Sequence, residues 1–446
     1  MADLTAITRG TRLLAASLHR SRALIQWPTR LLRPSLTTIE ERNSWNLCVE
    51  IFWAAVLSSV AAFNAAFAVR LGATNAEIGL LTSLPALLAV LVTIPSGRFL
   101  ESKAQRKGWI LASLLIHRSG YLLVALLPWL PVGSFNRGAL LVAVLVAMSI
   151  PVHFFNVGFS ALLADVVPER RRAATFAARN MILSGTVSLG VFLSGQWLEH
   201  FAFAFPLNYQ ALFLVGFVAS MVSMVYLMRV QVPETPVMPR AQGERLSLLA
   251  QWRSARRAMQ AHSDFVRITV DTVLYSLGAW VASPLYILYF VRELNATDAW
   301  IGLHSTIANV AAIVGYAVWR RIMARWGEAR TLRRAALGVG FYPLMVGLSP
   351  SLTPILFAVG LHSAIAPGVG LSHINTFLKA CPQERRPTYI AIYTTIVNVG
   401  AFLCPLLGVA LADRFGLGTT LVGCGLFWLL GATSFRLWPV RVPDTV

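Results

Sequence analysis

Three ionisable side chains lie deep inside apolar stretches of this sequence: Arg118, Glu50 and Asp271. Arg118 is 11 residues from both Lys107 and Trp129. At ~1.5 Å per helical residue it is about 16 Å from each, near the middle of a bilayer. Charges at that depth are costly and face a cavity or a partner. We therefore predict that Arg118 binds a polar or anionic substrate group or pairs with a titrating carboxylate. A structural ion pair or a side chain that reaches the membrane surface is the alternative.

The two buried carboxylates occupy matching depths. Glu50 lies 20 residues before Arg70, and Asp271 lies 21 before Arg292. Burial favours the neutral form of a carboxyl group and a nearby arginine favours the charged form, so either residue could carry a coupling proton. The alternative for Asp271 is local neutralisation by Arg267, four residues earlier on the same helix.

Polar and aromatic side chains form stripes beside these carboxylates. At ~100° per residue, one helical face holds Glu50, Trp53, Leu57, Ala61 and Asn64, and another holds Asp271, Tyr275, Gly278 and Tyr289. Aromatic rings with a few hydrogen-bonding groups suit an amphipathic or ring-containing solute. The predicted substrate-binding residues are Arg118, Asn64, Trp53, Tyr275, Tyr289 and His153.

His153 and His373 each follow a helical proline, Pro151 and Pro367. Because proline frees a backbone carbonyl, we expect each imidazole to bond such a carbonyl. A proton relay is the alternative role.

The elements that must position these residues are membrane helices. The chain has 446 residues, 56% hydrophobic and 13% charged, with a mean hydropathy of +0.64. Such a composition excludes a large soluble catalytic domain. Apolar stretches predict twelve spans, at about 46–69, 78–99, 109–129, 139–164, 176–198, 208–229, 266–291, 300–323, 332–349, 354–378, 388–411 and 417–438. The sequence contains no P-loop, H-E-x-x-H or G-x-S-x-G motif, so we expect neither an enzyme nor a metal or other cofactor.

The basic residues set the orientation. Of 38 Lys and Arg, 33 fall at the termini or in alternate loops and four in the opposite loops. The positive-inside rule then places both termini in the cytoplasm. The net charge of +19 is thus explained without nucleic acid. The basic segment 1–45 is expected either to lie on anionic lipids or to be a disordered leader.

The chain repeats itself. ATNAEIGL at 73–80 recurs as ATDAWIGL at 296–303, and VPERRRAATF at 167–176 has a counterpart in CPQERRPTY at 381–389. A long polar stretch separates the halves. We predict an all-α membrane protein of two pseudo-symmetric six-helix bundles, 46–230 and 265–438, with a cytoplasmic loop at 231–264 and a tail at 439–446.

This organisation resembles the major facilitator superfamily of secondary transporters. That family's 2–3 loop motif is approximately G-x-x-x-D-[RK]-x-G-[RK]-[RK]. Here the loop keeps a glycine, an acid four residues on and a basic pair, but lacks the second glycine and has one extra residue. The resemblance implies that this loop and its 8–9 counterpart brace the two halves in one conformation. The residues concerned are Gly97, Glu101, Arg106, Lys107, Arg325 and Gly327. Simple positive-inside anchoring is the alternative for the arginines.

The resemblance implies transport by alternating access in the bacterial inner membrane, by a monomer. Proton-coupled drug exporters of the family carry a glycine-proline motif in helix 5, whereas span 176–198 has glycines and no proline. We nevertheless expect proton-coupled export of an amphipathic compound, with protons and anionic lipids as further partners. The alternatives are an uptake symporter for a sugar or similar metabolite, and a non-transporting sensor of the same fold.

Overall fold

The computed structural model describes residues 38–103, 105–130, 136–200, 204–232, 263–381 and 386–437. Most of the predicted basic segment, nearly all of the central loop and the predicted tail lie outside these residues. Within the described ranges the regular structure is entirely helical, as the hydropathy pattern predicts.

The N-terminal half is a bundle of six spans. Its elements are α2 (Ile39–Ala61), α3 (Asn64–Arg70), α4 (Asn75–Glu101), α5 (Arg106–Leu126), η1 (Leu127–Trp129), α6 (Arg137–Val166), α7 (Glu169–His200) and α8 (Leu207–Met228). The helices α2 and α3 together form the first span.

The C-terminal half repeats this plan. It contains α10 (Ser263–Ala282), α11 (Leu285–Leu288), the π-helical turn η2 (Tyr289–Glu293), α12 (Asp298–Trp326), α13 (Glu328–Leu348), α14 (Leu352–Ala380), α15 (Arg386–Phe415) and α16 (Leu417–Leu437). Eleven described spans are long and apolar enough to cross a membrane. The remaining predicted span, 332–349, corresponds to α13, whose first turns carry Arg330, Arg333 and Arg334.

The first span of each half is interrupted, which the hydropathy pattern did not reveal. The break after Ala61 separates α2 from α3, and the break at Ser283 and Pro284 separates α10 from α11. Pro284 cannot donate a backbone hydrogen bond, which favours an interruption there. The two breaks lie at corresponding positions, so they are part of the repeated plan.

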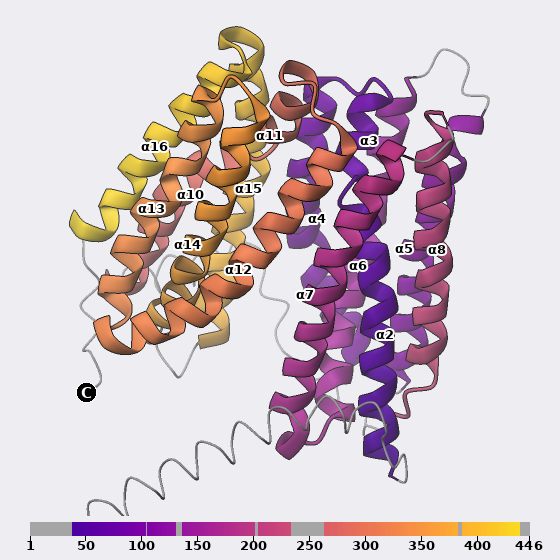
Figure 1. The fold of residues 1–446 in the computed structure, drawn as a ribbon. Helices are drawn as coiled ribbons and strands as arrows, with labels where there is room; N and C mark the ends of the chain where they lie inside the picture. Colours follow the sequence, from indigo (N-terminus) through magenta and orange to yellow (C-terminus); the bar gives the residue numbers. More distant parts are fainter. Residues whose placement is uncertain are drawn as a thin grey trace, which may run out of the picture.

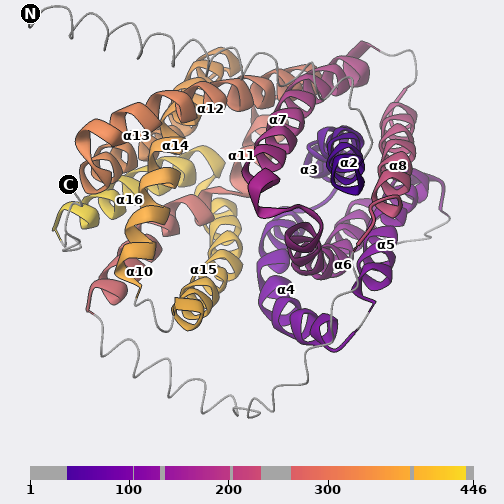
Figure 2. The ribbon, with the colours of Figure 1, turned by 90° about the horizontal axis from the view of Figure 1, so that it is seen from below.

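The two bundles meet at one end and diverge toward the other (Figure 1). We call the end that carries the loops after α3 and η2 the outer end, following the predicted orientation. Seen from the opposite end, α7 lies beside α12 and α4 beside α15 (Figure 2). The halves therefore touch mainly through two helix pairs.

The buried apolar core follows the arrangement of the two bundles. One continuous cluster joins both halves at the outer end and includes Phe67, Phe213, Phe290 and Val409. Toward the inner end the core splits into one cluster within the N-terminal half and another within the C-terminal half. The two bundles therefore share one core at the outer end and have separate cores at the inner end.

Candidate functional site

A buried ion cluster occupies the interior of the N-terminal bundle. Glu50 on α2 lies 3.0 Å from Arg179 on α7 and 3.6 Å from Arg118 on α5. Ser223 on α8 donates a hydrogen bond of 3.1 Å to the same carboxylate. Glu50 and Arg118 are each 3% exposed and Arg179 is 6% exposed. One negative charge therefore faces two positive charges in a low-dielectric interior.

The two arginines also donate to backbone carbonyls and to a serine hydroxyl, and one guanidinium lies over an aromatic ring. Arg118 donates to the Ser220 carbonyl at 2.6 Å and to Ser223 Oγ at 2.8 Å. Arg179 donates to the Leu47 carbonyl, and its guanidinium lies 5.2 Å from the centre of the Phe159 ring. These contacts tie α2, α5, α6, α7 and α8 together. The cluster has the geometry of a structural network inside one bundle.

Arg179 is a buried charged residue that was not among the predicted site residues. It lies inside the predicted span 176–198, but in the charge distribution it belongs to the basic residues of the preceding loop. Its position three residues into the span was the available signal. The structure brings it together with Glu50 and Arg118, the two predicted residues of this bundle.

Asp271 holds the corresponding place in the C-terminal bundle, with different surroundings. The residue is fully buried, and neither carboxylate oxygen accepts a hydrogen bond within the described part of the chain. The Ser434 hydroxyl, which donates to the Gly431 carbonyl, is a polar neighbour of the carboxylate, and Arg267 acts on it by charge. The Arg267 guanidinium instead forms its ion pair with Asp264, at 3.5 Å. Arg267 therefore acts on Asp271 by charge at longer range and forms no direct ion pair with it.

The polar stripe that includes Asp271 faces α16. The Tyr275 ring lies 5.6 Å from the Trp428 ring in an edge-to-face contact. A Cβ atom on Gly278 would lie 2.7 Å from the Cys424 carbonyl. Asp271, Tyr275 and Gly278 therefore lie in the interior of their own bundle, packed toward α16. Glu50 likewise lies in the interior of its own bundle.

The other predicted substrate-binding residues are dispersed. Asn64 lies beyond the break in the first span and donates to the Tyr121 hydroxyl at 3.4 Å. Trp53 is half-buried and makes an edge-to-face contact with Phe52. Tyr289 donates to the Ser349 carbonyl at 3.0 Å near the outer end. The structure does not bring these three residues together with Arg118.

The histidines have local partners. His153 Nε2 lies 3.1 Å from the Pro85 carbonyl on α4, and His373 Nε2 lies 2.7 Å from Thr272 Oγ1 on α10. His153 thus bonds a backbone carbonyl on α4 rather than the one freed by Pro151, and His373 bonds a hydroxyl rather than a carbonyl, so the expected local bonds are not the ones formed. Among the described residues no group of His, Cys, Asp and Glu has the arrangement of a metal site.

The loop-motif residues sit at the inner end. Lys107 donates to the carbonyls of Met228 and Val230, at 2.6 and 2.7 Å, and so caps the C-terminus of α8. Gly327, with φ +76°, ends α12. Glu101 ends α4 and is exposed, as is Arg325. Gly97 lies inside α4, and the buried Arg106 Nε has no acceptor among the described residues. Bracing by these loops remains a prediction for another conformation.

Polar contacts between the bundles concentrate at the outer end instead. Arg70, at the end of α3, donates to Asp298 Oδ1 at 3.0 Å and to the Ala296 carbonyl at 3.1 Å. The Tyr209 hydroxyl donates to the same carboxylate oxygen at 2.6 Å. Asp298 is 6% exposed and begins α12. This carboxylate is therefore held by donors from the opposite half.

A second set of contacts mirrors the first. Arg292, from the C-terminal half, donates to the Asn75 side chain and to the Ala73 carbonyl. Asn75 in turn donates to Asp413 at 2.6 Å. Residues 73–75 and 296–298 belong to the repeated ATNAEIGL and ATDAWIGL segments. We call these two reciprocal sets of contacts the outer latch: Arg70, Asp298 and Tyr209 in the charged arm, and Arg292, Asn75 and Asp413 in the second arm.

The helices α7 and α12 approach most closely beside the charged arm. A Cβ atom on Gly195 would lie 2.7 Å from the Asp298 carbonyl and 3.0 Å from Gly302 Cα. Only glycine allows this approach without displacing backbone. Deeper along the same helices, Thr306 donates to the Ser188 carbonyl at 3.1 Å.

Comparisons with known proteins agree with this architecture. The family profile described as Major Facilitator Superfamily matches residues 47–261 and 271–446. An uncharacterized MFS-type transporter of Methanocaldococcus jannaschii is 20% identical over 80% of this chain and 88% of its own length. The multidrug resistance protein MdtG of Dickeya zeae is 28% identical over 131 residues, covering 28% of this chain and 31% of that relative. The chain thus matches less than a third of MdtG.

Solved structures share the fold at low identity. A POT family transporter in complex with a thioalcohol-conjugated peptide aligns with a TM-score of 0.68 and 13% identity, covering 90% of this chain and 97% of that one. A bacterial homologue of the lysosomal transporter Spinster, in an inward-facing conformation, aligns with a TM-score of 0.61 and 14% identity, covering 91% and 97%.

Proposed function

The chain belongs to the major facilitator superfamily, and we propose that it exports small amphipathic compounds in exchange for protons. It is a multi-pass transporter of the inner membrane. The partial likeness to MdtG supports a multidrug type of substrate. The proposed exchange for protons depends on one observation, the buried carboxylate of Asp271.

Asp271 differs from Glu50 in the partners of its carboxyl group, which determine whether a buried carboxyl group binds a proton. An ionised carboxylate that is buried without a cation or a donor is very unfavourable, so it is neutralised by binding a proton. Glu50 has two arginines and a serine to stabilise its charge. Asp271 forms no ion pair among the described residues, and the groups that act on it are Ser434 and, at longer range, Arg267. We therefore propose that Asp271 carries the exchanged proton and that the Glu50 cluster is structural.

The arrangement of the bundles supports alternating access. With the outer end facing outside the cell, as the charge distribution predicts, this conformation is closed outside by the outer latch and divergent on the cytoplasmic side (Figure 1). An exporter would take up its substrate in such a state. Opening of the latch would then release the substrate outside.

The proposed exchange can be tested with a cationic dye. In proteoliposomes with an acidic lumen, protein whose inner end faces the bath is expected to concentrate ethidium in the lumen. A gradient of about 2 pH units stores about 2.7 kcal/mol per proton, which limits one-for-one electroneutral exchange to about 100-fold accumulation. Accumulation is measured by dye fluorescence, and nigericin, which collapses the gradient, should abolish it. Dye entry driven by an acidic bath would indicate symport, and absence of dye movement would indicate a non-transporting protein; either result contradicts the proposal.

Asp298→Asn is expected to shift the transporter toward a state open at the outer end. The substitution removes the charge that Arg70 and Tyr209 bind across the interface, worth about 2 kcal/mol or about a 30-fold change in the ratio of states. Spin labels at Arg137→Cys and Ser351→Cys, on opposite bundles, would report a larger population of long distances. Glu293→Gln, an exposed acid at the same end, is the control and should leave the distribution unchanged. An unchanged distribution in Asp298→Asn would show that the charged arm does not hold the bundles together.

A further inference from the structure

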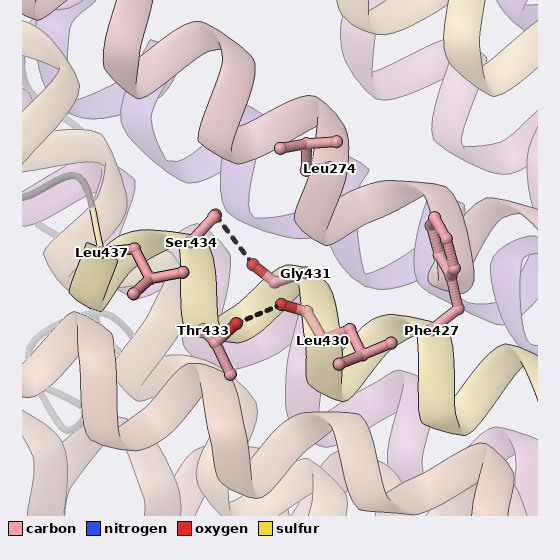
Figure 3. Close-up of a pocket in the computed structure, with 7 residues that line it drawn as sticks. All are labelled: Leu274, Phe427, Leu430, Gly431, Thr433, Ser434 and Leu437. Carbon is pink, nitrogen blue, oxygen red and sulfur yellow. Dashed lines mark hydrogen bonds between the residues drawn. The ribbon is translucent and has the colours of Figure 1, made fainter.

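A pocket of about 260 Å³ lies between α10 and α16, away from the contacts between the bundles. It is lined by Leu274, Phe427, Leu430, Gly431, Thr433, Ser434 and Leu437 (Figure 3). Phe427, Leu430 and Leu437 are 47%, 67% and 73% exposed. Exposed apolar side chains on a membrane-spanning helix face lipid. The pocket therefore opens toward the bilayer near the inner end of α16.

The lining offers almost no free polar group. The Thr433 hydroxyl donates to the Leu430 carbonyl at 2.6 Å, and the Ser434 hydroxyl donates to the Gly431 carbonyl at 2.8 Å (Figure 3). Both hydroxyls are thus engaged with their own helix. The walls suit the alkyl or aryl part of a ligand.

A buried carboxyl group lies next to this apolar pocket. Asp271 precedes the lining residue Leu274 by one helical turn and interacts with the lining residue Ser434. A Cβ atom on Gly431 would lie 2.9 Å from Tyr275 Cα, so α10 and α16 are in close contact at this level. The carboxylate is fully buried and without a hydrogen-bond donor among the described residues. It is the complementary group for a cation whose apolar part occupies the pocket.

We propose that this pocket is a lateral binding site for amphipathic amines that enter from the inner leaflet. The apolar part of the amine lies against Leu274, Phe427 and Leu430, and the ammonium group forms an ion pair with Asp271. Such a ligand and a proton neutralise the same carboxylate, so they compete for it. The inference deepens the proposed export function and rests on it for the substrate class.

Photolabelling tests the site without any transport measurement. The protein in phosphatidylcholine nanodiscs is exposed at pH 7 to a dodecylamine that carries an aliphatic diazirine, or to the matching dodecanol. We expect the amine to label peptides that contain Leu274, Phe427 or Leu430 about tenfold more than the alcohol, because only the amine pairs with the carboxylate. Asp271→Asn should reduce amine labelling to the level of the alcohol. Leu430→Trp, which fills the pocket from its exposed side, should reduce both.

Two further variants are controls for the labelling experiment. Asp264→Asn removes a half-exposed acid from the same helix and should leave labelling unchanged, and Asp271→Glu should retain the preference for the amine. Equal labelling by amine and alcohol in the unmodified protein would reduce the site to an apolar lipid groove. Persistence of the preference in Asp271→Asn would also overturn the proposal. Because no pH gradient is applied, failure of proton-driven export would leave this labelling result intact.

Discussion

Glu50→Gln is expected to be among the most destabilising single substitutions in this chain, lowering the free energy of unfolding by about 3–5 kcal/mol. Removing the carboxylate leaves Arg118 and Arg179 as two buried, uncompensated cations that face each other. The loss is measured as thermal unfolding of the detergent-purified protein. Glu101→Gln, which removes an exposed acid at the inner end, should change stability by no more than about 0.5 kcal/mol.

A second variant separates charge from packing in this cluster. Glu50→Gln combined with Arg179→Gln removes one of the uncompensated cations and should recover part of the lost stability. If the single Glu50→Gln variant unfolds like the unmodified protein, the carboxylate is not ionised in the bundle and the structural role fails. In a variant that still transports, unchanged pH dependence would remove Glu50 from the proton path.

Asp271→Asn is expected to abolish proton-driven accumulation while the protein stays folded. The asparagine cannot bind and release a proton, so dye accumulation should fall from the gradient-driven level to none, a loss of up to about 100-fold for a gradient of about 2 pH units. Stability should change little, because a protonated carboxyl group is replaced by a neutral amide of nearly the same shape.

The control for this prediction lies on the same helix. Asp264→Asn alters an acid near the start of α10 that pairs with Arg267, and it should preserve proton-driven accumulation. Both variants are assayed in the same proteoliposomes with the same dye. Proton-driven accumulation that survives in Asp271→Asn would exclude this carboxylate as the proton carrier.

The fold was predictable from the sequence because its signals are local. Apolar length, the bias of basic residues and the ATNAEIGL repeat each act over one span or one loop, and they predicted two related six-helix bundles. The same local rules gave the depths of Glu50, Arg118 and Asp271. The breaks after Ala61 and at Ser283 were not predicted, since the apolar pattern continues through them.

The partners of the buried charges were not predictable in the same way. Periodicity shows which residues share a face of one helix, but it does not show which neighbouring helix that face meets. Glu50 pairs with Arg179, 129 positions away, and Asp271 faces α16 rather than a cavity. The outer latch was present in the sequence as a repeat, yet its reciprocal contacts require the packed bundles.

The close glycine contact between α7 and α12 also determines how far the inner end of α12 would move when this helix tilts. Since Gly195 and Gly302 bring the two helices together at the outer end, the stretch of α12 from Gly302 to Trp326 acts as a lever about 36 Å long, at ~1.5 Å per residue. Rotation of about 10° around this fulcrum displaces the inner tip by about 6 Å, given the same rise per residue. A tilt of this size would therefore change the separation of the two bundles at the inner end by about the diameter of a small solute.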